Sequence, residues 1–354
     1  WRVDAWLSEG VDDMLDVSVP WATSDRVQWT DSALPLGAVD DRYPVLVREY
    51  DTPDGRLKHA VRWIQEGQAR GWVTQPDHVP LIEDFNVARG VQHLVTTPED
   101  VGKMRWLFGE PAAAEASWLR ERMALLRSFA QDRGVMIQAW SAFGADAAVW
   151  LAGAEGAVML CMEQREAFEQ LLAVIHAVDI ARTRLALEED VDMVVQRGWY
   201  SSTDFWSPRL FRECFKPRIG ELAALAHSRG KLFAYVMTTG VMTLGPDLAD
   251  AGVDLLYYAD PVQDHVDLAE AAARFRGRLA VAGGINSGVT LSRGSADEIR
   301  TAVRDALSAF GDEGGFILSP VDALFPDTPT ESVDTMIDAW REWIRAARQQ
   351  HSKT

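Results

Sequence analysis

The stretch "KLFAYVMTTG" (231–240) decides the fold, because it joins a continuous apolar run to a polar turn. An apolar run of this length is typical of a strand buried on both faces, as in a parallel sheet. Similar runs recur along the chain: "VMIQAW" (135–140), "VDMVVQ" (191–196), "VDLLYYA" (253–259), "RLAVAGG" (278–284) and "GGFILS" (314–319). Each of them is predicted to be a buried parallel strand.

Helical segments lie between these runs. The apolar residues of 163–188 recur at helical spacing and form one stripe. Segment 207–230 has Ser207 as its N-cap, Pro208 at its first helical position and Gly230 at its end. Segment 295–311, which runs from a serine to a glycine, repeats this pattern. Strands that alternate with helices indicate a parallel α/β fold.

We therefore predict a (β/α)8 TIM-type barrel with an N-terminal elaboration. Residues 131–354 form its main part, and residues 1–130 form the elaboration and the first barrel elements, within one domain overall. Two further strands could lie in the less regular N-terminal third, near 79–85 ("VPLIEDF"), and would complete the eight-stranded barrel. The alternative is a doubly wound open sheet, but the chain lacks the GxGxxG and P-loop motifs that often follow the first strand of such sheets.

The elaboration carries two local signals. Two β-like runs flank Pro53-Asp54-Gly55, which is typical of a hairpin turn. Thr97 is predicted to cap a helix that begins at Pro98, with Asp100 as its capping-box partner.

Composition limits the class of protein. The net charge of −18, from 35 basic and 53 acidic residues, repels nucleic acid and anionic membranes. No apolar run reaches the roughly 18 residues of a membrane span, and the N-terminus does not have the pattern of a signal peptide. The two cysteines, Cys161 and Cys214, form no CxxC motif, which favours a cytoplasmic protein. A homodimer is left open.

Candidate site residues follow the predicted strands, because a barrel carries its chemistry where strands end and loops begin. Segment 197–208 ("RGWYSSTDFWSP") is the most unusual. Its aromatic residues Trp199, Tyr200 and Trp206 could form a ligand wall, with Asp204 as a charge or proton acceptor. Alternatively, the aromatic side chains anchor the loop to the barrel.

Other candidates lie at neighbouring strand ends. Asp322 could act as a general base or bind a cationic ligand, or it could bond nearby backbone as loop aspartates do. Tyr235 and Met237 share one strand face and would either contact a ligand or fill the barrel. The remaining predicted substrate-binding residues are Thr239, Asn286, Glu83 and Asn86.

The chain resembles the uroporphyrinogen decarboxylase superfamily over roughly residues 134–345. The resemblance rests on "SPRLFRECFKPRI" (207–219), a strand ending in "TTG" (238–240), "LADAGVDLL" (248–256) and the closing "GGFILSPVDALFPDTPTESVDTMIDAW" (314–340). The early "EYDTPDGRL" (49–57) and "TTPEDVGKM" (96–104) are more similar to the corrinoid-linked methyltransferase branch. This resemblance also implies a (β/α)8 barrel.

Departures from the family patterns limit what the resemblance implies. True decarboxylases carry an Arg-rich N-terminus and a late His, whereas this chain begins with acidic residues and has Asp322 at the late position. The zinc-dependent methyltransferases use His-x-Cys at one strand end and a later Cys. The matching positions are Met237-Thr238-Thr239 and Asp322, which do not make a zinc site. We therefore predict no metal site and an organic-ligand pocket in its place.

Taken together, the resemblance implies a methyltransferase-like enzyme. It would transfer a methyl group from a small organic donor, aromatic or quaternary amine, to a corrinoid supplied by a partner protein. The chain itself would hold no tight cofactor, and Asp322, Asp204 and Tyr200 would be its catalytic residues. One alternative is a cofactor-independent lyase or decarboxylase that uses the same residues on a small organic acid. The other is a non-catalytic ligand-binding barrel.

Overall fold

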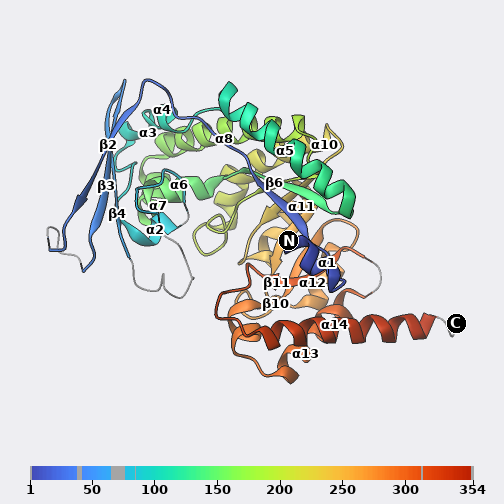
Figure 1. The fold of residues 1–354 in the computed structure, drawn as a ribbon. Coiled ribbons are helices and arrows are strands. Elements are labelled where there is room, and N and C mark those ends of the chain that lie inside the picture. Colours follow the sequence, from blue (N-terminus) through green and yellow to red (C-terminus); the bar gives the residue numbers. More distant parts are fainter. Residues whose placement is uncertain (1, 38–41, 65–75, 84, 312–313, 352–354) are drawn as a thin grey trace. The chain divides into compact units, whose positions relative to one another are not determined.

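The computed structural model describes residues 2–37, 42–64, 76–83, 85–311 and 314–351 (Figure 1). The chain divides into two compact units. One unit is Leu15–Ser201, and the other combines Trp1–Met14 with Ser202–Thr354. The predicted boundary at residues 130 and 131 rests on sequence character and stays a prediction.

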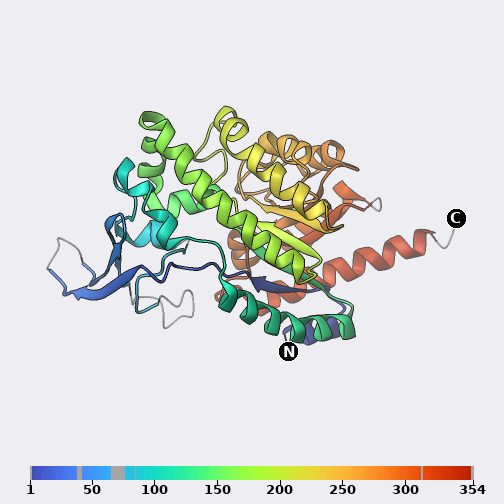
Figure 2. The ribbon, with the colours of Figure 1, turned by 90° about the horizontal axis from the view of Figure 1, so that it is seen from above.

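The unit Leu15–Ser201 contains strands in the order β1 (Met14–Ser18), β6 (Met136–Ala142) and β7 (Met193–Gln196). Strands β6 and β7 are parallel, as predicted. The long helices α5 (Ala113–Arg133) and α8 (Arg165–Glu188) pack against β6 (Figure 2). The predicted apolar stripe of 163–188 is confirmed, since its members Phe168, Leu171, Leu172, Ile175, Val178 and Leu185 are buried on α8. Helices α6 (Ala145–Ala152) and α7 (Ala154–Glu163) lie between β6 and α8 in the chain.

An antiparallel sheet forms the N-terminal elaboration of the same unit. Its strand order is β2 (Gln28–Leu34), β3 (Val45–Thr52), β4 (Gly55–Arg62) and β5 (Gly90–Gln92). The predicted hairpin is confirmed by β3 and β4, and Gly55 adopts φ +120°, which a glycine accepts readily. The predicted capping box of Thr97 is also present, at the start of α3 (Pro98–Val101).

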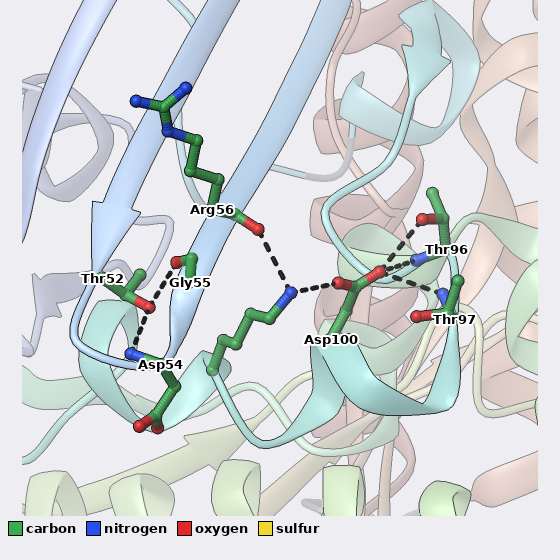
Figure 3. A network of polar contacts seen from close by, with 8 residues as sticks. Thr52, Asp54, Gly55, Arg56, Thr96, Thr97 and Asp100 are labelled. Carbon is green, nitrogen blue, oxygen red and sulfur yellow. Dashed lines mark hydrogen bonds and ion pairs between the residues drawn. The ribbon is translucent and has the colours of Figure 1, made fainter.

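A polar network joins the hairpin turn to this capped helix (Figure 3). The Lys103 ammonium, just before α4 (Met104–Leu107), donates to the Arg56 carbonyl at 3.2 Å and to Asp100 at 2.9 Å. Asp100 in turn accepts from both the backbone N–H and the hydroxyl of Thr96. The local turn and the local cap therefore stabilise each other.

The strand predicted near 79–85 is wrong. Residues 79–83 form no strand, and Phe85 already begins α2 (Phe85–Arg89). Pro80 has no N–H to donate to a ladder, and Glu83 binds the buried Arg89 guanidinium at 2.8 Å instead of lining a sheet. Among the described residues 79–83, Val79 alone is buried as the apolar pattern suggests.

The second unit contains parallel strands in the order β8 (Leu232–Val236), β9 (Leu255–Ala259), β10 (Ala280–Asn286) and β11 (Phe316–Val321). The strands predicted from the apolar runs are thus all found. At Gly283, with φ +130°, an added Cβ would lie 2.6 Å from the Ala259 carbonyl oxygen. Strands β9 and β10 therefore approach closely at the ends that carry polar loops.

Helices precede β8 and follow each of the four strands. The helical elements described in this unit are α1 (Arg2–Ser8), α9 (Pro208–Leu210), η2 (Phe211–Phe215), α10 (Lys216–His227), α11 (Val241–Asp250), α12 (Leu268–Phe275), η3 (Ser287–Leu291), α13 (Ala296–Phe310) and α14 (Thr330–His351). The predicted caps are confirmed, because Ser207 accepts from the Leu210 N–H and Ser295 forms a capping box with Glu298. Helix α13 packs against β10 and β11, and α14 packs against α13 (Figure 1).

Within the described residues, no single helix is long and apolar enough to cross a membrane. One bent pair, α6 with α7, passes that test by length and composition only. Both cysteines, Cys161 and Cys214, are buried, and the two form no disulfide.

The buried His59 of β4 makes the unit Leu15–Ser201 sensitive to acid. The side chain is 0% exposed, and neither ring nitrogen has a hydrogen-bond partner among the described residues. Burial lowers the pKa of His59 to about 3, and the nearby His93 and Arg89 add to the shift. The folded state therefore excludes a proton that the unfolded chain binds below pH ~6.5.

We predict that His59→Phe reduces the loss of stability on acidification. Between pH ~6.5 and about 3 the wild-type should lose up to ~1.4 kcal/mol per pH unit through this group. Urea unfolding of both proteins at several pH values measures the difference. His78→Gln, at an exposed ring, is the matched control. Equal acid sensitivity of wild-type and His59→Phe would contradict the prediction.

Candidate active site

A group of carboxylates lies at the ends of strands β8 and β9. We call Asp204, Asp260 and Asp264, with the hydroxyl of Thr239, the strand-end carboxylate cluster. Thr239 follows the buried strand β8 and donates to the Asp204 carboxylate at 2.7 Å. Asp204 is exposed, whereas Thr239 is 7% exposed. The sequence predicted both residues, and the structure brings them together.

Asp264 fixes the start of helix α11. Its two carboxylate oxygens accept from the backbone N–H groups of Gly240 and Val241, at 2.7 and 2.9 Å. A negative charge is favourable at a helix N-terminus. Burial nevertheless raises the pKa of Asp264 above its ordinary value, and the negative charges of Asp204 and Asp260 add to the shift. Burial and the neighbouring charges together outweigh the two backbone hydrogen bonds, so the carboxylate of Asp264 is harder to ionise than an ordinary aspartate.

Asp260 and Asn286 link two neighbouring strand ends. Asp260, directly after β9, is 1% exposed and accepts from the Asn286 amide at 2.7 Å. Asn286, at the end of β10, also accepts from the Val289 N–H at 2.7 Å. The sequence predicted Asn286 but missed Asp260 and Asp264. The available signal was a carboxylate immediately after the apolar run "VDLLYYA".

Other predicted residues of this unit lie deeper. Tyr235 and Met237 are fully buried, which agrees with the alternative that they fill the interior. Trp206 is 2% exposed and packs edge-to-face on Phe215 with ring centroids 5.2 Å apart, as an anchoring side chain would. Asp322 is exposed directly after β11, with φ +68°. Ligand roles for these residues stay predictions.

The positions that match the family's zinc ligands do not fit a zinc ion. Met237 offers a thioether, Thr239 offers a hydroxyl that is bonded to Asp204, and Asp322 offers one carboxylate. Catalytic zinc needs three protein ligands, commonly His, Cys or carboxylate. Among the described residues, no group of three or more His, Cys, Asp or Glu is arranged to hold a metal.

A second, separate group lies at the ends of β6 and β7 in the unit Leu15–Ser201. The rings of Trp140 and Trp199 are stacked, with centroids 5.9 Å apart and planes 3° apart. The Arg197 guanidinium lies over Trp140 at 5.1 Å and over Phe143 at 4.9 Å. The predicted ligand-wall residue Trp199 is therefore part of an ordered stack of aromatic rings and arginine.

Asp146 of α6 holds the segment that carries this stack. It is 0% exposed and accepts from the Tyr200 N–H at 3.0 Å and from the Ser201 hydroxyl at 2.8 Å. Burial raises the pKa of Asp146 to about 7, against these hydrogen bonds and the positive charge of Arg197. Tyr200 thus binds Asp146 through its backbone. Asp146 was not predicted from the sequence, because its role depends on tertiary contacts with Tyr200 and Ser201.

A neighbouring carboxylate performs the same task for the preceding loop. Asp179 of α8 is 1% exposed and accepts from the N–H groups of Phe143 and Gly144, at 2.9 and 2.8 Å. Burial raises the pKa of Asp179, and the buried Arg182 at 3.7 Å opposes that shift. The loop after β6 is therefore held in place by a buried ion pair.

Two predicted residues belong to neither group. Glu83 binds Arg89, which also donates to the Arg62 carbonyl of the antiparallel sheet at 3.2 Å. This contact gives Glu83 a structural partner. Asn86 belongs to helix α2, and its side chain lies outside the described part of the chain.

We predict that Asp146→Asn changes the pH dependence of stability. The folded pKa is above the unfolded value of ~3.9, so the folded state binds more protons and wild-type stability falls as pH rises. Relative to Asp146→Asn, which cannot ionise, wild-type should lose about 1.4 kcal/mol per pH unit from pH ~4 to about 7. Urea unfolding of both proteins at several pH values measures this difference in the free energy of unfolding. Parallel profiles for the two proteins would show that Asp146 does not titrate in this way.

A family model and one solved structure agree with this architecture. A family model described as "Uroporphyrinogen decarboxylase (URO-D)" matches residues 90–343, more than half of the chain. A methyltransferase from Methanosarcina mazei is 17% identical, with a TM-score of 0.56, over 78% of this chain and 82% of its own. The 3-keto-D-glucoside 4-epimerase of E. coli is 13% identical, with a TM-score of 0.38, over 72% of this chain and 96% of its own.

At 17% identity the likeness to the methyltransferase concerns the fold alone. A comparison with curated proteins gave no significant match. The parallel α/β fold with an added antiparallel sheet is the barrel type that the sequence predicted. The extent of the family match therefore settles the family: the chain belongs to the uroporphyrinogen decarboxylase (URO-D) family.

Proposed function

We propose that this protein is a methyltransferase that takes a methyl group from a small quaternary amine and passes it to a corrinoid carried by a partner protein. The observation that carries the proposal is the strand-end carboxylate cluster. Asp264 has a raised pKa partly because Asp204 and Asp260 oppose its ionisation. A cation placed among these groups relieves that repulsion, so the cluster favours a cationic ligand over a neutral or anionic one.

The chemistry of a quaternary amine suits a site of this composition. When the methyl–nitrogen bond breaks, the bonding electron pair stays on nitrogen, and the leaving group is a neutral tertiary amine. The methyl group bonds to the reduced corrinoid, which supplies the electron pair as co-substrate. A neutral leaving group needs neither a metal ion nor a proton. Methyl transfer from a quaternary amine would therefore need no zinc at the positions of Met237, Thr239 and Asp322.

Each residue of the cluster has a distinct task in this proposal. Asp204 faces the ligand as the exposed carboxylate, and its hydrogen bond from Thr239 sets its orientation. Asp260 and Asp264 are held by backbone and by Asn286, so they contribute a fixed negative field. Fixed charges of this kind stabilise a ligand without reorganisation. Asp322 is a further carboxylate at a strand end of the same unit.

The alternatives are less suited to this group of carboxylates. An aromatic methyl ether releases a phenoxide, which is anionic unless it receives a proton or a metal ion. A lyase or decarboxylase acting on a small organic acid would have to place a second anion beside Asp204. A non-catalytic barrel remains as an outcome of the tests below. We further propose a cytoplasmic location, which suits the buried Cys161 and Cys214 because they form no disulfide.

We predict methyl transfer from tetramethylammonium or choline to chemically reduced cobalamin, followed by the absorbance change of the cobalamin and by release of the tertiary amine. An aryl methyl ether should give no product. Asp204→Asn should raise KM about tenfold, because it removes the exposed charge, and Thr239→Val should have a smaller effect.

The controls separate charge, metal and folding. Asp297→Asn removes an exposed carboxylate of α13 outside the cluster and should behave as wild-type. A chelator should leave the rate unchanged, because the residues at the former zinc positions do not fit zinc. Turnover of the ether with none from any quaternary amine would contradict the proposal. Stable binding without turnover of any donor would favour the non-catalytic barrel.

We also predict that binding of tetramethylammonium strengthens as pH rises. Protonated Asp264 lacks the charge that attracts a cation, and its pKa lies above the ordinary value. Affinity should therefore increase as pH passes through that raised pKa, and binding below it should release protons. Calorimetric titrations in buffers of different ionisation enthalpy detect the released protons. Affinity that is independent of pH from about 4 to 7 would contradict this linkage.

A further inference from the structure

An open groove in the second unit is lined by residues of α1 and α14. Its volume is about 550 Å³, and the loop after β11 forms one wall. The groove is lined by Trp6, Glu9, Leu324, Phe325, Thr328, Thr330, Val333, Asp334, Ile337, Asp338 and Arg341. We call it the α1–α14 groove.

The floor of the groove is apolar although it faces solvent. Helix α14 buries Met336 and Ala339 in the core, against residues of β10, η3 and α13. Val333 and Ile337 lie one turn apart beside that buried face and remain only half-buried. Leu324 is 39% exposed. Helix α14 therefore has a second apolar strip that this chain does not fully cover.

The rim of the groove is acidic. Arg341 is already engaged, with Glu9 at 2.9 Å and Asp338 at 3.6 Å. Asp334 is in none of the ion pairs found in the described part of the chain, and Asp327 and Glu331 are exposed nearby in the sequence. An apolar floor with a net negative rim matches a ligand that presents apolar side chains flanked by Lys or Arg.

The position of the groove indicates which kind of ligand this is. Its wall, Leu324 and Phe325, belongs to the same loop as Asp322, which begins at the end of β11. A protein that delivers a methyl acceptor to the strand ends must dock beside them. A second copy of this chain, at −18, would bring like charge to an acidic rim.

We propose that the α1–α14 groove docks a positively charged amphipathic segment of the protein that carries the methyl acceptor. This proposal rests on the proposed function for the identity of the partner. The apolar side chains of the segment pack on Val333, Ile337 and Leu324, and its Lys or Arg side chains pair with Asp334 and the neighbouring rim. Apolar anchors ringed by charge are typical of helix-in-groove recognition.

Short labelled peptides test the groove directly, with fluorescence anisotropy of the full chain at about 0.15 M salt. An amphipathic Leu–Lys peptide should bind. A Ser–Lys peptide of equal charge should bind at least about tenfold more weakly, and a Leu–Glu peptide should not bind. Ile337→Ser and Asp334→Asn should each weaken binding of the Leu–Lys peptide about tenfold.

Control variants outside the groove test whether the cationic peptides bind any part of this acidic protein. Leu125→Ser removes an exposed leucine of α5, and Asp297→Asn removes an exposed carboxylate of α13. Both should leave binding unchanged. Equal binding of the Ser–Lys and Leu–Lys peptides, or equal effects of groove and control variants, would overturn the proposal. So would a dimer that Ile337→Ser dissociates, because the groove would then hold a second copy.

The test also separates this inference from the proposed function. Asp204→Asn acts on donor binding and should leave peptide binding unchanged. Groove-dependent peptide binding without methyl transfer from any donor would support the groove and refute the methyltransferase. Methyl transfer to free cobalamin without groove-dependent peptide binding would support the methyltransferase and refute the groove.

Discussion

The carboxylate of Asp264 is the constraint on which the strand-end carboxylate cluster depends. It accepts from two backbone N–H groups at the start of α11, and these hydrogen bonds fix its position beside the chain that precedes that helix. That chain carries Thr239, which in turn orients Asp204. Because Asp260 is fixed by Asn286 and by its own turn, the carboxylates remain close despite their mutual repulsion. A folded structure that maintains such repulsion is ready to bind positive charge.

Much of the fold could be predicted from the sequence because its signals are local. Continuous apolar runs predict buried parallel strands, and Ser207, Ser295 and Thr97 predict helix starts, since a cap depends on residues three positions away. The prediction of a strand near 79–85 was wrong because its apolar pattern does not decide the structure of that segment. Its apolar residues resemble a short strand, but Pro80 and the pairing of Glu83 with Arg89 give that segment irregular structure.

The candidate site could be predicted only in part. Asp204, Thr239 and Asn286 follow predicted strands or lie in an unusual segment, so their position in the sequence identifies them. Asp264 and Asp146 could not be found in this way. The role of each depends on a partner far along the chain, since Asp264 caps α11 and Asp146 holds Ser201. Their raised pKa values come from burial, which residue type alone does not reveal.

The central claim is that positive charge, and not shape, selects the ligand of the cluster. Calorimetric titration with choline and with its neutral carbon isostere, 3,3-dimethyl-1-butanol, tests this claim most directly because the two molecules differ mainly in charge. We expect choline to bind at least about tenfold more tightly than the isostere, and the difference to become smaller in Asp204→Asn. Equal affinity for the two molecules in the wild-type protein would contradict the account.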